Sequence, residues 1–303
     1  MQQTLNKGVD GLKQEYLATS KAVDPREAVA FKENNINGKN RFTDLCCLDL
    51  TRVVLRKHPI DYIHANYIAS IRNKHRFIVT QGPLDTSIVD FWRMIVQESV
   101  ESIVMLCDFY EENRSKCARY FPTEKGERMM FDNYEIICSH ISDLMVKKMD
   151  PDEQRIICTE LKVSSRATVT KVNHYRWGSW PDRKVPKSTQ AVLTLLHTVR
   201  SSITPIVVHC STGIGRACTL VAIEVLLEDL IAGKEAPTVE LLQNLRKQRA
   251  HAISTDLQWV FVHKAVIDYF NNKGRLKCCA DMCRVNKFYE DYKKFVEESA
   301  KLK

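Results

Sequence analysis

The sequence predicts an α/β domain in which a twisted, mixed β-sheet is flanked by helices. Two observations predict this class. Short apolar or alternating runs that suit β-strands are interleaved with longer runs that suit helices. Near residue 210, a β-branched run turns through two glycines directly into a helix-like run, which makes an anion-binding loop between a strand and a helix. No repeat, low-complexity tract or Pro/Gly/Ser-rich linker interrupts the chain, so residues 1–303 are expected to form a single domain.

The composition excludes several classes of protein. The chain has 303 residues, of which 44% are hydrophobic, and this length can bury a large core without disulfides. The formal charge of +8 mildly favours an anionic ligand, but the basic residues are scattered among acidic ones, and no nucleic-acid-binding arm stands out. No apolar stretch approaches the length of a membrane span, and the N-terminus lacks the apolar core of a signal peptide. The sequence therefore predicts a cytoplasmic protein that does not insert into membranes.

The cysteines predict free thiols. Their number, 11, is odd, and no targeting segment directs the chain to an oxidising compartment. The densest groups are Cys46-Cys47 and Cys278-Cys279 with Cys283, and neither has the spacing of a zinc site. Buried or surface thiols are favoured over a metal site, and no metal or other cofactor is expected.

The elements are expected in the following order. Residues 1–38 form an N-terminal helical segment, with helical patterns at 12–17 and 25–34 that end in an Asn/Gly-rich turn at 34–40. Strand-like runs lie at 62–71, 77–80, 102–106, 134–141, 155–163, 168–177 and 205–209, and helix-like runs lie at 88–98, 189–201, 216–231 and 238–248.

The C-terminal segment 277–303 is expected to be an amphipathic helix. Within it, Val285, Phe288, Tyr292 and Phe295 recur at helical spacing among many Lys and Glu residues. Packing of this apolar face on the chain's own domain is favoured over a partner-binding or membrane-surface role, because the polar side carries charges of both signs.

The glycine-containing loop carries the residues on which the functional hypothesis depends. Cys210 opens it, Gly213 and Gly215 lie within it, and Arg216 begins the next helix. The loop N–H groups and the positive end of the helix would bind a phosphate and stabilise a thiolate on Cys210. Arg216 can grip two phosphate oxygens with its planar guanidinium. The alternative is a buried thiol, two ordinary turn glycines and a solvated arginine, which the neighbouring His209 and the strand-to-helix context disfavour.

The segment from His209 to Arg216 resembles the signature loop of the cysteine-dependent protein tyrosine phosphatases. Further segments resemble blocks of that family in the same order: 39–44 its phosphotyrosine-recognition loop, 61–68 the following strand, then 80–83, 90–92, Glu111, Lys116 and Cys117. The resemblance runs from about residue 39 to residue 270. It implies the tyrosine-phosphatase fold and a phosphotyrosine-specific, non-receptor-like catalytic domain. In that domain Cys210 would be the nucleophile, Arg216 the phosphate clamp, and the phosphate would be bound by Ser211, Thr212, Gly213, Ile214 and Gly215.

A second segment, Trp180-Pro181-Asp182, resembles the family's mobile acid loop. A tyrosine leaving group needs a proton, because the pKa of a phenol is about 10. The resemblance implies that Asp182 donates this proton and later deprotonates the attacking water. Taken alone, the tripeptide is typical of a simple turn, and its place in the order of motifs favours the acid. Arg183-Lys184 depart from the family, in which a glycine commonly precedes the Val-Pro, and this change could stiffen loop closure.

The resemblance also implies how a substrate would be held. Phe42 stands where the family usually has a tyrosine, and its ring can stack on the substrate phenyl group. Asp44 matches the carboxylate that holds the N–H groups of the substrate peptide, with a cap or turn role as the alternative. A pocket deep enough to exclude phosphoserine argues against dual specificity. Glu111 is expected to form an ion pair that orients Arg216, with a surface carboxylate as the alternative. His64 stands where the family often has asparagine, and it is interpreted as a change in the scaffold.

Two departures fall on residues that serve the second chemical step. Ala217 stands where the family usually has Ser or Thr. Ser254 stands where the family normally has the water-positioning member of a pair of glutamines, so that Gln258 is the one glutamine of the pair that remains. These changes predict slow hydrolysis of the phosphocysteine intermediate. The alternative is that a nearby hydroxyl or water compensates for them.

Three functions remain open at this point. The first is hydrolysis of phosphotyrosine in proteins by a metal-independent monomer that forms a phosphocysteine intermediate. The second is a pseudophosphatase or substrate-trapping module that binds phosphotyrosine without turning it over. The third, a phosphoinositide phosphatase, ranks last because Ser211, Thr212 and Ile214 add no positive charge to the loop.

Overall fold

A computed structural model describes residues 1–147, 150, 153, 155–166, 168–234, 237–276 and 279–301. Within these residues the long sheet is mixed, as predicted. Its central strands β3, β11, β4 and β10 run parallel to one another, and every pairing outside this group, including β2 with β3 and β9 with β10, is antiparallel. The order across the sheet is β1 (Arg52–Val54), β2 (Tyr62–Ile68), β3 (Phe77–Thr80), β11 (Ile206–His209), β4 (Ser102–Met105), β10 (Thr168–Arg176), β9 (Ile156–Ser165), β8 (Tyr134–Leu144) and β7 (Arg128–Phe131). A separate short hairpin pairs β5 (Tyr110–Glu111) with β6 (Arg114–Ser115).

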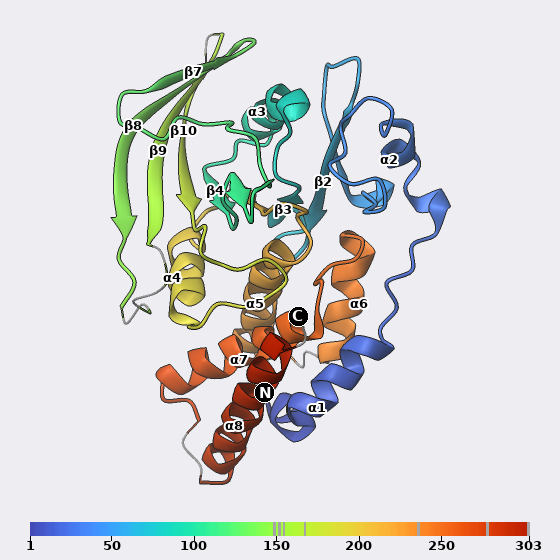
Figure 1. Ribbon diagram of the computed structural model, residues 1–303, viewed down its shortest axis with the longest axis vertical. Coiled ribbons are helices and arrows are strands. Elements are labelled where there is room, and N and C mark those ends of the chain that lie inside the picture. Colours follow the sequence, from blue (N-terminus) through green and yellow to red (C-terminus); the bar gives the residue numbers. More distant parts are fainter. Residues whose placement is uncertain are drawn as a thin grey trace.

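Helices flank the sheet. They are α1 (Gln2–Ala18), α2 (Val29–Glu33), α3 (Ile88–Gln97), α4 (Gln190–Val199), α5 (Arg216–Ile231), α6 (Thr238–Gln248), α7 (Asp256–Asn272) and α8 (Cys279–Lys301). Figure 1 shows α5 below the centre of the sheet and α3 above it, with α1, α7 and α8 gathered at the lower end of the molecule. Helix α5 packs on α7, and α7 in turn packs on α1 and α8. The strand-to-helix connection from β11 to α5 therefore lies at the centre of the fold.

The central strands are buried on both faces. Every residue of β3, β4 and β11 is buried, which is expected of parallel strands covered by helices on each side. The same apolar cluster extends from α1 to α8. Val285, Phe288, Tyr292 and Phe295 are buried in it, so the predicted apolar face of the C-terminal helix does pack on the chain itself. Residues 277, 278, 302 and 303 of that predicted segment lie outside the described residues.

Several predicted elements differ from the structure at their ends. The strand predicted at 62–71 ends at Ile68, because the chain then turns between Ser70 and Asn73. The helix predicted at 25–34 is divided, since Ala28 has a non-helical backbone between a 3₁₀ turn (Pro25–Glu27) and α2. Helix α7 was not predicted. Its apolar residues recur on every side, so it carries little of the one-sided periodicity that marks a surface helix.

Three further features bear on the composition. The cysteines whose side chains the structure describes are free thiols, as predicted. Among the described residues, His, Cys, Asp and Glu side chains do not gather into a group that could hold a metal ion. In the same part of the chain, every helix is too short or too polar to span a bilayer.

Candidate active site

The loop between β11 and α5 contains two glycines at positions where any larger residue would collide with its neighbours. Gly213 has a φ of +67°, and a Cβ on it would lie 2.2 Å from the carbonyl oxygen of Thr80. Gly215 has an ordinary φ, but a Cβ there would lie 2.8 Å from the Ser254 hydroxyl oxygen. Only glycine lets the loop approach both β3 and the segment before α7 this closely. The predicted strand and helix are therefore present, and the glycine-containing segment between them forms one tight loop.

Cys210 is at the base of this loop with its sulfur facing the loop N–H groups. Its side chain is buried, and the Gly213 N–H donates a hydrogen bond to Sγ over 3.2 Å. The Thr212 hydroxyl oxygen lies 3.9 Å from the same sulfur and accepts a hydrogen bond from the Ile214 N–H, so its own proton is free to point at Sγ. These donors would stabilise negative charge on the sulfur.

Arg216 is fixed by an acidic partner and a backbone carbonyl. Its two terminal nitrogens donate to the two carboxylate oxygens of Glu111 over 2.5 and 3.0 Å, and Nη1 also donates to the Trp180 carbonyl over 2.9 Å. Burial opposes its charge, but the nearby Cys210 and Glu111 outweigh burial and raise the pKa of Arg216. The guanidinium is therefore a permanent cation whose plane is preset. The predicted ion pair with Glu111 is present, and the surface-carboxylate alternative is not.

Asp182 lies at the same site, beside two cationic side chains. Lys116 Nζ donates to its Oδ2 over 2.8 Å, and Arg216 Nη2 is 3.5 Å from Oδ1. Burial tends to raise the pKa of Asp182, but the Lys116 hydrogen bond and the Arg216 charge outweigh it and lower the pKa. A phosphate dianion beside Arg216 would add negative charge and shift this pKa upward. Bound phosphate would therefore favour the protonated form of Asp182, which is the form that a proton donor needs.

The predicted acid loop is packed at its base and exposed at its tip. Trp180 is fully buried, meets the Phe261 ring edge-to-face and donates its indole N–H to the Lys184 carbonyl over 3.0 Å. The left-handed backbone falls on Arg183, with a φ of +57°, and not on Lys184. The position of the missing glycine thus has no need of one, so the sequence departure at Lys184 costs no backbone strain.

The predicted recognition loop exposes two of its side chains. Phe42 is 39% exposed and Asp44 is exposed, so both are free to meet a ligand. Arg41 next to them is a scaffold residue, because its guanidinium donates to the Gly82 and Pro83 carbonyls.

The loop from Cys210 to Gly215 is called the phosphate loop from here on. The segment before α7 reaches the phosphate loop at Gly215. A Cβ on Gly215 would lie 3.1 to 3.2 Å from the amide atoms of Gln258, which is fully buried. The Gln258 amide oxygen accepts from the Ser254 N–H over 3.1 Å. Both residues named from the sequence therefore do border the loop. Ala217 is buried at the start of α5 and brings no hydroxyl to it.

His209 supports the loop from below. Its Nδ1 lies 3.2 Å from the Cys210 carbonyl, and its Nε2 lies 2.8 Å from the hydroxyl of Tyr120, which also meets His174 Nε2 at 2.6 Å. Burial lowers the pKa of His209 to about 4. The ring is therefore neutral at neutral pH and supports the loop through its hydrogen bonds.

The chain as a whole matches a known family. Residues 36–268 match the model of the family described as protein-tyrosine phosphatase. The chain belongs to the protein-tyrosine phosphatase family. It is 34% identical over 260 residues to tyrosine-protein phosphatase non-receptor type 9 of Rattus norvegicus, which covers 78% of this chain and 42% of that protein. It is also 34% identical over 251 residues to receptor-type tyrosine-protein phosphatase C of Rattus norvegicus, which covers 79% of this chain and 19% of that protein.

Solved structures agree with the family assignment and with the predicted fold. A structure of PTPN18 in complex with HER2-pY1248 phosphopeptides has a TM-score of 0.72 and 28% identity, with 86% of this chain and 97% of that chain covered. A second PTPN18 structure, on distinct HER2 tyrosine phosphorylation sites, has a TM-score of 0.71 and 30% identity, with 78% and 85% covered. This chain spans less than half the length of the full-length phosphatases it resembles.

Sequence reasoning missed one residue that holds this protein-tyrosine phosphatase loop in place. Arg249 is fully buried and donates to the carbonyls of Gly213 and Thr212, each over 3.1 Å. A buried arginine requires neutral or acidic acceptors, but its partners lie 36 and 37 residues away in the sequence, so no local pattern marks them. The only sequence signal is that Gln248-Arg249 resembles part of the family's glutamine-containing segment, a resemblance that assigns Arg249 no role.

Proposed function

We propose that this chain hydrolyses phosphotyrosine in proteins through a phosphocysteine intermediate. The observation that carries the proposal is the single cluster in which the Cys210 sulfur, the loop N–H groups, the Arg216 guanidinium and the Asp182 carboxyl face one small volume. Membership of the family supports it. The complexes of the related PTPN18 with phosphopeptides support phosphotyrosine-containing proteins as the substrate class.

Each step of the reaction uses groups in this cluster. The Cys210 thiolate attacks phosphorus, the S–P bond forms, and the bond to the tyrosine oxygen breaks as Asp182 gives that oxygen its proton. Water then attacks phosphorus and loses a proton to Asp182, and the S–P bond breaks to restore the thiolate. Arg216 and the loop N–H groups stabilise charge on the equatorial oxygens in both steps.

The finer part of the proposal is a slow second step. The residues that border the loop at Ala217 and Ser254 offer no amide and only one hydroxyl to the leaving sulfur or the attacking water. The Thr219 hydroxyl is committed to the Gly215 carbonyl over 2.8 Å, whereas the Thr212 hydroxyl lies 3.9 Å from Sγ. If Thr212 does not replace the missing contacts, phosphocysteine accumulates. The alternative function, a phosphotyrosine-binding pseudophosphatase, rests on the same two residues.

Rapid mixing with a phosphotyrosyl peptide in EDTA tests both possibilities. We expect a burst of tyrosine equal to one per enzyme, followed by slow release of phosphate, because the first step keeps all its groups. Ala217→Ser and Ser254→Gln should each speed phosphate release by about 10-fold. Ala222→Ser adds a buried hydroxyl elsewhere on α5 and is the matched control, with no change expected.

The other outcomes separate the alternatives. Equal rates of tyrosine and phosphate release without a burst would show that the second step is not slowed. Tight peptide binding with neither product released would contradict hydrolysis and favour the pseudophosphatase.

We also propose that residues 1–303 form one catalytic domain that acts as a cytoplasmic monomer, without a cofactor and without binding nucleic acid or inserting into a membrane. The apolar cluster that joins α1, the sheet and α8 supports a single domain. The mixture of 45 basic and 37 acidic residues supports the absence of a nucleic-acid surface. Light scattering during gel filtration should give the mass of one chain, and a mass of two chains would contradict the monomer.

A further inference from the structure

His64 lies between the recognition loop and the phosphate loop. It is buried on β2, and its Nε2 is 2.8 Å from the carbonyl oxygen of Leu45, which directly follows the recognition residues Phe42 and Asp44. A carbonyl can only accept, so Nε2 must carry the ring proton. The other ring nitrogen, Nδ1, is then a bare acceptor, and it lies 3.1 Å from Arg249 Nη2. The hydrogen-bond partners therefore allow one neutral tautomer.

Arg249 continues this chain of hydrogen bonds into the phosphate loop. Nη2, which faces His64, also donates to the Thr212 carbonyl, and Nε donates to the Gly213 carbonyl. Nη1 donates to the Asn66 amide oxygen over 2.8 Å. Holding the loop carbonyls on the outer side keeps the matching N–H groups turned inward, where the Gly213 N–H meets the Cys210 sulfur.

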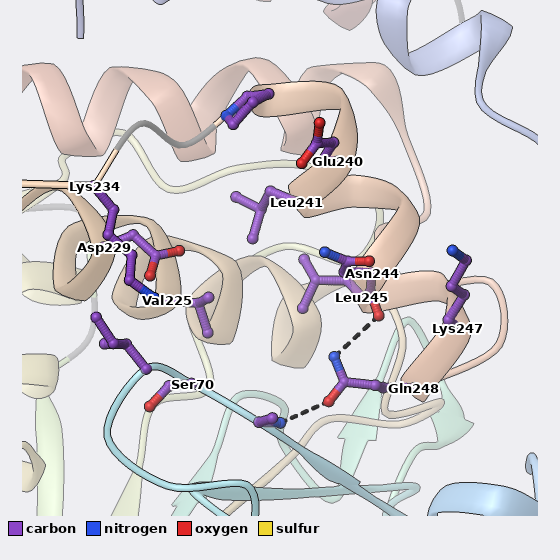
Figure 2. Close-up of a pocket in the computed structure, with 13 residues that line it drawn as sticks. Ser70, Val225, Asp229, Lys234, Glu240, Leu241, Asn244, Leu245, Lys247 and Gln248 are labelled. Carbon is purple, nitrogen blue, oxygen red and sulfur yellow. Dashed lines mark hydrogen bonds between the residues drawn. The ribbon is translucent and has the colours of Figure 1, made fainter.

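The backbone before Arg249 is anchored to the strand that carries His64. Figure 2 shows Gln248 at the end of α6, with its amide bonded on both sides. Its oxygen accepts from the Ala69 N–H over 2.7 Å, just beyond the end of β2, and its nitrogen donates to the Asn244 carbonyl over 3.0 Å. The Thr51 hydroxyl donates to the Gln248 carbonyl over 2.6 Å. With the backbone fixed, the aim of the Arg249 side chain depends on its two acceptors on β2, His64 and Asn66.

We propose that His64 is a positioning residue that couples the recognition loop to the phosphate loop through Arg249. Its one imidazole fixes Leu45, and with it the end of the recognition loop, while it orients the cation that holds the loop N–H groups toward phosphate. The inference rests on the proposed function and adds a determinant of specificity to it. A second proton on the ring would set an N–H against Arg249, but burial, followed by the charge of Arg249, lowers the pKa of His64 to about 3. The link therefore holds at neutral pH.

The first test compares two substrates with variants of His64. We expect His64→Ala to lower kcat by about 10-fold to 100-fold on a phosphotyrosyl peptide and on p-nitrophenyl phosphate, because the loop N–H groups lose their alignment. KM should rise more for the peptide than for p-nitrophenyl phosphate, because the smaller substrate has a ring for Phe42 but no peptide N–H groups for Asp44 to hold. His64→Asn offers a donor and an acceptor in a smaller side chain and should recover most of the loss. His75→Ala, a histidine of the same hairpin that stacks on Tyr67, is the matched control with no expected change.

A structural role alone would give a different pattern. Loss of folded protein lowers kcat equally for both substrates, leaves both KM values unchanged and is not repaired by asparagine. That pattern, or a kcat for His64→Ala within about 2-fold of the unaltered chain, would overturn the coupling.

The second test needs no variant and so does not depend on how His64→Ala folds. In ¹⁵N-labelled protein at pH 7, His64 should show a protonated Nε2 and an unprotonated Nδ1. Orthovanadate, a phosphate-like anion for the loop, should shift the Nδ1 resonance although it does not touch His64. A protonated Nδ1, or a resonance that ignores bound vanadate, would overturn the inference. Failure of vanadate to bind at all would instead count against the proposed function.

Discussion

Replacing Cys210 with serine is expected to lower the rate of tyrosine release from a phosphotyrosyl peptide by at least about 10⁴-fold. A serine hydroxyl attacks only when a base removes its proton, whereas a thiol can ionise without one. In the described part of the chain, Sγ is hydrogen-bonded by the Gly213 N–H and approached by the Thr212 hydroxyl, and neither group is a base. The nearest imidazole, His209, is committed to the Cys210 carbonyl and to Tyr120.

The measurement should separate binding from chemistry. Single-turnover kinetics gives the rate of tyrosine release, and calorimetry with the same peptide gives its affinity, which should stay within about 10-fold because Arg216 and the loop N–H groups remain. Cys283→Ser makes the same chemical change at an exposed thiol on α8 and should leave the rate unchanged. A Cys210→Ser chain that retains even a hundredth of the original rate would contradict the assignment of Cys210 as nucleophile.

Apart from the Glu111–Arg216 pair and Asp182, which the resemblance to the family implied, the parts of the site that the sequence predicted are those built from neighbours in the chain. The loop from Cys210 to Arg216 follows from a strand, two glycines and a helix in direct succession, and the structure shows the same order with the helix beginning at Arg216. The alternating strands and the apolar face of α8 were predictable for the same reason, because their period is written locally. Periodicity gave no such signal for α7, which is buried on nearly every side.

The parts that the sequence did not predict are contacts between distant segments. Arg249 meets Asn66 and His64 across more than 180 positions, and these contacts exist only once α6 is docked on β2. Lys116 likewise reaches Asp182 across 66 positions, from just after the β5–β6 hairpin, and helps to lower the pKa of Asp182 against the opposing effect of burial. Such pairs depend on tertiary packing, and no local rule of composition or spacing would reveal which arginine or lysine is buried.

Acid is expected to destabilise the folded chain through its buried histidines. Burial lowers the pKa of His64 and His263 to about 3 and that of His209 to about 4, whereas a histidine in the unfolded chain has a pKa near 6.5. Between these values the unfolded chain takes up protons that the folded chain does not. The stability that these neutral histidines contribute is therefore complete above pH 6.5. It is lost as the pH falls from there toward their folded-state pKa values of about 4 and about 3. At pH 5 each of the three costs about 2 kcal/mol, or about 6 kcal/mol together.

The effect can be isolated at His263, which the proposed reaction does not use. It is fully buried on α7, 3.5 Å from the Thr4 hydroxyl and edge-on to Trp259. Urea unfolding followed by tryptophan fluorescence at pH 7.5 and pH 5 should show that His263→Gln loses about 2 kcal/mol less than the unaltered chain over this interval, whatever its stability at pH 7.5. His140→Gln, on the exposed part of β8, is the matched control, because this histidine is solvated in the folded and unfolded chain alike. An equal loss in the His263→Gln chain and the unaltered chain would mean that the folded state admits a proton at His263. The buried histidines would then be weaker acid sensors than their surroundings imply.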